Sequence, residues 1–241
     1  MFRSRLWLRN APAAALLVLL ACDRDPPAPA VQASATPVRC ARGAVDPPRA
    51  ESQPAERLLR DQKYAEARKA FDALAAKYPE SSNLLVWRGD ADLNDDQDYL
   101  GSAERALGFY RRARELDRQG CTLSEIGRYY TSLHSAFAHL RRDDAAQALS
   151  ELGALAETYP DSAEIQYNLS RAHCLQKKVS ECYTHFAKTL ELARARTRPK
   201  FQRTHYAVAD WIRRSETQSE LAPLRSDPRY TALVKQMISE P

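Results

Sequence analysis

The sequence predicts an all-α protein built from repeated pairs of helices, and three observations support this fold class. Residues 64–81 recur in similar form at 145–162, and both copies end in Tyr-Pro followed by an acid and a serine. Self-similarity at a distance is typical of repeat proteins. Inside each copy, small or apolar residues recur at helical spacing. The chain has only 7 glycines and is rich in Ala, Leu, Arg and Glu, so its composition favours helices over strands.

Each copy is predicted to be one amphipathic helix that ends at a proline, Pro79 or Pro160. The residues on the predicted buried face are Ala67, Ala70, Phe71, Leu74 and Tyr78 in the first copy, and Ala148, Leu152, Leu155 and Tyr159 in the second. The spacing of Ala67, Phe71, Leu74 and Pro79 resembles that of a tetratricopeptide repeat. This resemblance implies an α-solenoid of antiparallel helix pairs, in which a small residue lets the two helices of a pair touch.

Residues 1–21 are predicted to be an export signal. Arg3, Arg5 and Arg9 precede an apolar run at 11–20 that is too short to span a membrane. The ending Leu-Leu-Ala-Cys at 19–22 resembles a bacterial lipobox, which implies cleavage before Cys22 and attachment of acyl chains such as palmitate to this residue. Several acyl chains on one residue hold a protein stably to a bilayer. The alternative is an ordinary signal peptide in which this cysteine is incidental.

Residues 22–53 are predicted to form a disordered tether, because Pro and Ala are frequent and no apolar periodicity occurs. The repeat domain is predicted over 54–238, with about four repeats that bury one another's apolar faces.

The helix pairs of this domain are predicted in order along the chain. The first pair is expected at 55–60 and 64–78, and the second begins near Ser82 and continues, after a short insertion, in a helix with Ala106, Tyr110 and Ala113. The third is expected at 122–140 and 144–159, and the fourth carries Leu169, Ser170, His173, Cys182 and Phe186. After Pro199, one helix with Phe201, Val208, Trp211 and Ile212 is predicted to close the open end, and 221–234 resembles a motif that follows the last repeat in related proteins.

Composition and motifs argue against two classes of function. A formal charge of +5 would fall to about +2 with removal of the leader, and the remaining Lys and Arg alternate with acids, so nucleic-acid binding is not expected. The chain has no Gly-rich phosphate loop, no Gly-x-Ser-x-Gly and no His-Glu-x-x-His. We therefore expect no enzymatic activity and no cofactor.

An acidic run at 90–98 offers one alternative, a calcium site or an active site. Asp90, Asp92 and Asn94 match the first, third and fifth ligand positions of a calcium loop. Asp95 stands where the turn needs glycine, and Gly101 stands where a bidentate Glu is needed, so a solvated loop is the competing interpretation.

The cysteines suggest a disulfide more strongly than a metal site. An exported chain without Cys22 would keep Cys40, Cys121, Cys174 and Cys182, an even number in an oxidising compartment. The candidate bridge is Cys174–Cys182, although the resemblance places their Cα atoms near the upper limit for a disulfide. A zinc site of His173, Cys174, Cys182 and His185 lacks the usual closely spaced cysteine pairs, so no metal is predicted.

An apolar stripe on the third leading helix is the candidate binding surface. It comprises Leu123, Ile126, Tyr130, Leu133, Phe137 and Leu140 at helical spacing. The family resemblance implies that Tyr130, Leu133, Phe137 and Leu140 face the concave side, where such proteins grip a peptide, with Tyr167 and Arg171 from the next repeat. The alternative is that the stripe is core.

The sequence therefore predicts a lipid-anchored adaptor of the bacterial cell envelope that binds a segment of another envelope protein. An assembly factor for outer-membrane or pilus components is the alternative within this class, because lipoproteins of barrel assembly and pilotins resemble this combination of lipobox, tether and repeats.

Overall fold

The computed structural model describes residues 46–95, 98–118, 122–202 and 206–239. The predicted leader and residues 22–45 of the predicted tether lie outside these ranges, as do Cys22, Cys40 and Cys121.

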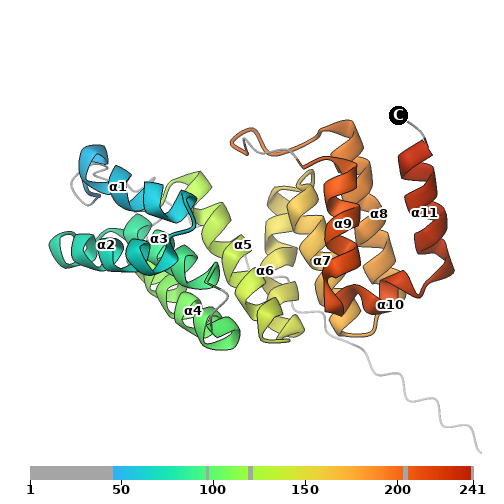
Figure 1. Ribbon diagram of the computed structural model, residues 1–241, viewed down its shortest axis with the longest axis horizontal. Helices are drawn as coiled ribbons and strands as arrows, with labels where there is room; N and C mark the ends of the chain where they lie inside the picture. The colour runs from blue at the N-terminus through green and yellow to red at the C-terminus, as the bar shows by residue number, and fades with distance from the viewer. Residues whose placement is uncertain (1–45, 96–97, 119–121, 203–205, 240–241) are drawn as a thin grey trace, which may run out of the picture. The chain divides into compact units, whose positions relative to one another are not determined.

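The described residues form helices and no strand, which confirms the predicted fold class (Figure 1). The helices are α1 (Arg49–Arg60), α2 (Tyr64–Lys77), α3 (Ser82–Leu93), α4 (Tyr99–Leu116), α5 (Glu125–Arg141), α6 (Ala145–Thr158), α7 (Ala163–Leu175), α8 (Val179–Ala195), α9 (Val208–Thr217), α10 (Ala222–Arg225) and α11 (Pro228–Ser239). Each helix from α1 to α8 packs against the next, and α3, α5 and α7 also touch one another in sequence. We call α1, α3, α5, α7 and α9 the inner helices.

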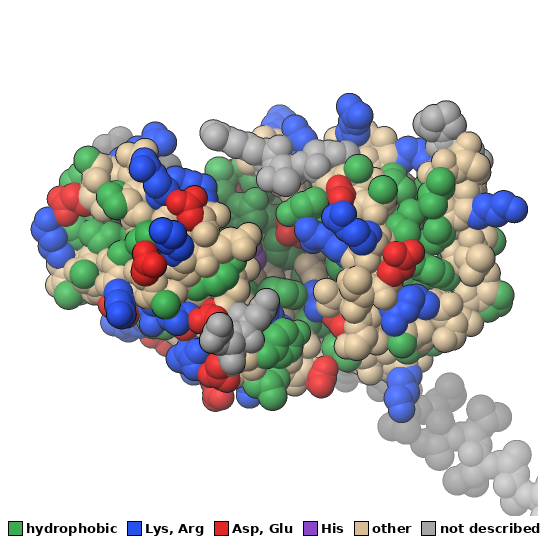
Figure 2. Space-filling model, viewed as in Figure 1, with side chains coloured by type: hydrophobic (Ala, Val, Ile, Leu, Met, Phe, Trp, Pro, Cys, Tyr) green, Lys and Arg blue, Asp and Glu red, His purple; other side chains and the backbone are tan. Residues whose placement is uncertain are grey.

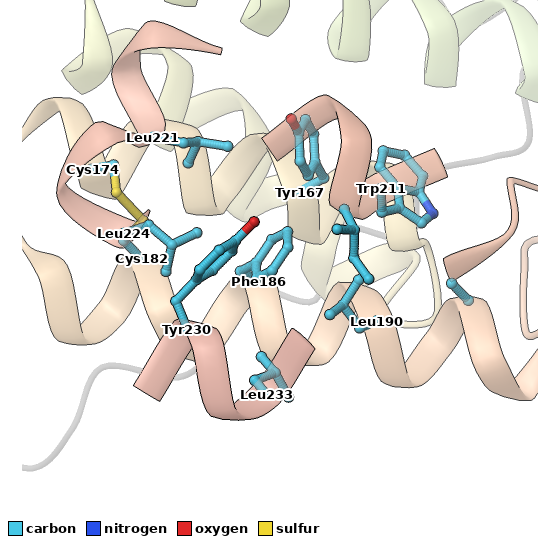
Figure 3. Packing of buried hydrophobic residues seen from close by; sticks show 12 residues of the cluster. Tyr167, Cys174, Cys182, Phe186, Leu190, Trp211, Leu221, Leu224, Tyr230 and Leu233 are labelled. Atoms are coloured by element: carbon cyan, nitrogen blue, oxygen red, sulfur yellow. A yellow bond between two sulfur atoms is a disulfide. The ribbon is translucent and has the colours of Figure 1, made fainter. Parts of the chain in front are cut away.

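The buried side chains form four clusters, and each joins one helix pair to the inner helix of the next. The first cluster is drawn from α1, α2 and α3, the second from α3, α4 and α5, and the third from α5, α6 and α7. The last joins α7 and α8 to α9, α10 and α11, and Figure 3 shows its aromatic centre around Phe186, Tyr167 and Tyr230. Each pair therefore needs its neighbour to cover its apolar face, as expected for a solenoid.

Helix ends use the same devices in successive repeats. Ser81, Ser124 and Ser162 accept hydrogen bonds from backbone N–H groups in the first turns of α3, α5 and α7. Three of the turns inside a pair contain a non-glycine residue in the left-handed region, with φ of 60° at Gln62, 55° at Asp143 and 60° at Lys177. Such a residue lets the chain reverse directly after a helix.

The first helix begins earlier than predicted, at Arg49 in place of residue 55, so the folded part extends into the predicted tether. Its buried face there consists of Ser52, which is 3% exposed, and Ala55. A small polar residue at a buried position gives no apolar signal in the sequence. The segment before α1 is also fixed, because Ser81 and Asn83 both donate hydrogen bonds to the Asp46 carboxylate.

Phe201 does not belong to the C-terminal helix, because α9 begins only at Val208. Its ring packs against Tyr129 at 4.9 Å and Tyr159 at 5.4 Å between ring centroids. The chain after α8 therefore returns to the third repeat before it forms α9. Trp211 and Ile212 close the C-terminal cluster as predicted, at 2% and 6% exposure.

Candidate functional site

A cavity of about 330 Å³ lies between the inner helices α5, α7 and α9, next to the end of α3. The face shown in Figure 2 is hollowed between α5 and α9. We call this the C-terminal hollow. The residues that line it are Leu93, Asn94, Leu133, His134, Phe137, Glu164, Tyr167, Asn168, Arg171, Tyr206, Trp211, Arg214 and Gln218.

A second hollow of about 380 Å³ lies between α1, α3 and α5, and we call it the N-terminal hollow. Its lining includes the apolar side chains of Leu59, Val86, Trp87, Ile126 and Tyr130. Ile126 is 44% exposed, although it is large and apolar. The two hollows share His134, so the inner helices offer two adjoining binding surfaces.

At this junction, His134 of α5 belongs to a hydrogen-bonded network with one side chain from α3 and one from α4. Its Nδ1 lies 2.7 Å from Oδ1 of Asp90, and the Tyr110 hydroxyl donates to the same oxygen at 2.7 Å. Burial alone would lower the pKa of His134, but the Asp90 carboxylate outweighs it and raises that pKa. Burial, together with Asp90, raises the pKa of Tyr110 well above its ordinary value.

Glu164, in the first turn of α7, places a carboxylate in the C-terminal hollow. Gln202 donates a hydrogen bond to it from Nε2 at 3.1 Å. Burial raises the pKa of Glu164, and the charges of His134 and Arg214 only partly oppose this rise. Glu164 forms no ion pair with any Lys or Arg in the described ranges.

Two arginines line the same hollow, but they are held differently. Arg171 is 3% exposed, pairs with Glu220 and donates to Oδ1 of Asn168 at 3.0 Å. Its guanidinium is therefore already held by groups of this chain. The guanidinium of Arg214 lies over two rings, 4.1 Å from the centroid of Tyr206 and 5.1 Å from that of Trp211.

Some residues predicted as the binding surface line one of the two hollows, and others are buried in the core. Leu133, Phe137, Tyr167 and Arg171 line the C-terminal hollow, and Tyr130 lines the N-terminal hollow. Leu140 lines neither, since it is 3% exposed and packs in the cluster of α5, α6 and α7. Leu133 and Tyr167 are also nearly buried, so only part of each side chain borders its hollow.

The main residues missed by sequence reasoning are His134, Glu164, Tyr206 and Arg214. A lone histidine and scattered charges on amphipathic helices carry no pattern that marks them as a site. All four lie on inner helices or beside one, and Tyr206 and Arg214 could have been placed there only from a correct start for α9.

The acidic run does not form the calcium loop of the alternative interpretation. Asp90 and Asp92 lie within α3, and Asp98 caps α4 by accepting from the Gly101 N–H. Asp92 pairs with three arginines and Asp98 with one. Within the part of the chain that the structure describes, no group of three potential metal ligands occurs.

Cys174 and Cys182 form a disulfide that joins α7 to α8, with Cα atoms 5.2 Å apart. This Cα separation is shorter than the family resemblance implied, because the turn between α7 and α8 brings the two residues closer together. Since both thiols are consumed, the zinc tetrad with His173 and His185 does not form. The two imidazoles instead stack at 5.1 Å.

Replacing both cysteines, Cys174→Ala with Cys182→Ala, should lower the free energy of unfolding by about 2–3 kcal/mol, because the bridge limits the freedom of a short loop in the unfolded chain. Urea unfolding with and without a reductant measures this loss. The reductant should destabilise the parent chain and leave the double variant unchanged. Equal midpoints for parent and variant without reductant would contradict the bridge.

None of the helices in the described ranges is both long enough and apolar enough to span a bilayer.

Comparisons with known proteins agree with this arrangement. The family model described as tetratricopeptide repeat matches residues 56–81 and 130–162, which correspond to most of α1–α2 and of α5–α6. A solved structure of MamA residues 41 to the end from Desulfovibrio magneticus RS-1 superposes with a TM-score of 0.53 at 15% identity, over 79% of this chain and 94% of that one. A MamA RS-1 ArsTM double mutant gives a TM-score of 0.52 at 15% identity, over 79% and 93%. No curated protein matches by sequence.

Proposed function

The chain is a tetratricopeptide-repeat protein, and from this premise we propose that it is a lipid-anchored scaffold that binds a segment of another envelope protein along its inner helices. The observation that carries the proposal is the pair of hollows that adjoin at His134. Proteins of this repeat class are generally scaffolds without chemistry of their own, and the described residues offer pockets lined by aromatic and amphipathic side chains. Such linings suit an extended or helical peptide.

The N-terminal hollow supplies the exposed apolar contacts for this segment. Trp87, Tyr130 and Ile126 border it, and aromatic side chains give large contact area at low entropy cost. A peptide lying across α1, α3 and α5 would reach His134 and then the C-terminal hollow.

The binding surface is tested by changing Ile126→Arg. The substitution places a charged side chain in the N-terminal hollow at a position that is 44% exposed, so the melting temperature should stay nearly unchanged. The chain is cross-linked to its partner protein in the native host and then captured. The amount of partner recovered with the variant should be at least about tenfold lower, as expected for the loss of one anchoring contact. Leu100→Arg is the matched control, because Leu100 is apolar, 61% exposed and outside both hollows. Equal losses for the two variants would refute the proposed surface.

The envelope anchor rests on the leader and on Cys22. The disulfide between Cys174 and Cys182 supports it, since structural disulfides are typical of exported proteins. A role in assembling outer-membrane or pilus components is the second candidate, favoured by the same lipobox and tether.

Acylated Cys22 is expected to be the first residue of the protein isolated from membranes. Intact-mass and peptide mass spectrometry measure this directly, and Cys22→Ser should release the protein from the membrane fraction. An unmodified Cys22, or a chain that starts elsewhere, would refute the anchor without affecting the binding surface.

A further inference from the structure

We propose that the C-terminal hollow takes a primary ammonium group on an apolar stem, as carried by a lysine side chain of the partner segment, and that Glu164 is its counter-charge. The proposal rests on the proposed function, since it names the chemistry of the segment that the inner helices hold.

Among the described residues, Glu164 differs from Glu220 and Asp90 in having no arginine or histidine within ion-pair distance. Glu220 pairs with Arg171, and Asp90 accepts from His134 and Tyr110. Glu164 accepts one hydrogen bond from the neutral amide of Gln202, and no Lys or Arg in the described ranges pairs with it. Glu164 is half-buried, and the charges of His134 and Arg214 only partly offset the cost of removing its ionised carboxylate from water. A ligand cation would supply the direct ion pair that the described residues do not.

The walls of the hollow suit a cation that arrives on a methylene stem. Phe137, Tyr206 and Trp211 line it, and ring faces attract cations while their apolar surface packs against methylenes. A cavity of about 330 Å³ has room for such a side chain. The ammonium would meet Glu164 at the start of α7.

An acidic ligand is the competing class, and the arginines argue against it. Arg171 is already paired with Glu220. Arg214 is satisfied in part by the faces of Tyr206 and Trp211, and a ligand carboxylate beside it would also face the charge of Glu164.

The dependence of binding on pH separates these two classes. The charged and titratable groups around Glu164 and His134 include Asp90 on α3, Tyr110 on α4, Tyr129 and Tyr130 on α5, Arg214 on α9 and Tyr206 just before it. The pKa values of Glu164 and His134 are both raised, so each group keeps its proton to a higher pH than usual, and protons compete more strongly with a cationic ligand as the pH falls. Affinity for an ammonium should therefore rise with pH, and affinity for a carboxylate should fall.

The test uses three capped pentapeptides, Ac-Ala-Ala-Lys-Ala-Ala-NH2 and its Gln and Glu counterparts, titrated into the purified chain between pH 5.5 and 8. Binding is read from the NMR signal of the Trp211 indole N–H, which a Trp211→Phe variant assigns. The Lys peptide should bind at least about tenfold more tightly than the Gln peptide, as expected for a charged hydrogen bond, and more tightly at pH 8 than at pH 5.5.

Glu164→Gln should remove the preference for the Lys peptide and weaken the dependence on pH, with His134 accounting for what remains, while its amide oxygen can still accept from Gln202. Glu157→Gln, on the exposed face of α6, is the matched control and should bind as the parent does. Equal binding of the three peptides would overturn the ammonium assignment and leave the hollow as a binding surface. Tighter binding of the Glu peptide at low pH would overturn it in favour of an acid. No response to any peptide would overturn it and count against the hollow itself.

Discussion

Asp92→Ala is expected to lower the free energy of unfolding by about 3 kcal/mol, because three arginines lose the buried carboxylate that they share, although each keeps a second acidic partner. Asp92 is fully buried on α3. Its carboxylate pairs with Arg68 of α2 at 4.0 Å, with Arg88 one turn earlier, and with Arg105 of α4 at 3.2 Å. Three successive helices are thus joined at one side chain.

Asp72→Ala provides the matched control. Asp72 also pairs with Arg88, with an Nε to Oδ1 distance of 2.7 Å, but its side chain is 57% exposed. An exposed ion pair contributes at most about 1 kcal/mol, so this variant should unfold nearly as the parent does. Chemical denaturation of both variants measures the two losses. Similar losses at Asp72 and Asp92 would show that the buried network is not what holds α2, α3 and α4 together.

The same network explains why the acidic run was open to misinterpretation from the sequence. Spacing alone aligns Asp90, Asp92 and Asn94 with ligand positions of a calcium loop. Arg88 lies one helical turn before Asp92 and is a local partner, but no local pattern predicts that Arg68 and Arg105 reach the same carboxylate. The helix that continues through Leu93 also removes the loop that calcium would need.

Features that depend on local sequence were predictable, including the repeated helices and their ends before a proline. The duplicated segment predicted two helices, α2 and α6. The observed bounds differ from the predicted ones by one residue at the end of α2 and by one residue at each end of α6. The tight turns before α2, α6 and α8 could not be read as easily from the sequence, because Gln62, Asp143 and Lys177 adopt left-handed backbone without being glycine. Tertiary packing supplies the stability that such residues cost.

The binding surface was only partly predictable, for a physical reason. An apolar stripe such as 123–140 gives the face of a helix, but it does not tell where neighbouring helices stop covering it. Phe137 and Tyr130 border the hollows while Leu140 is core, and the difference depends on how α7 and α9 approach α5. The return of Phe201 to Tyr129 sets part of that approach, and its long-range contact leaves no periodic signal.

Trp211→Ala should cost about 3–5 kcal/mol of unfolding free energy, the range for removing a large aromatic side chain from a core. Trp211 is 2% exposed on α9, with its ring centroid 4.9 Å from that of Tyr167 and 5.3 Å from that of Tyr206. It therefore joins the C-terminal helices to the last repeat. If α9 to α11 form one cooperative unit with the repeats, circular dichroism and tryptophan fluorescence should report a single shifted transition.

Trp211→Phe separates the packing role from the indole N–H. Nε1 of Trp211 is buried and has no hydrogen-bond partner within the described ranges, so a phenyl ring removes an unsatisfied donor and keeps most of the apolar contact. This variant should lose less than about 1.5 kcal/mol. A small loss for Trp211→Ala, with an early separate transition of the C-terminal helices, would show instead that the repeats are stable without their cap. In that case the C-terminal hollow would depend on an element that can detach, because α9 provides one of its walls.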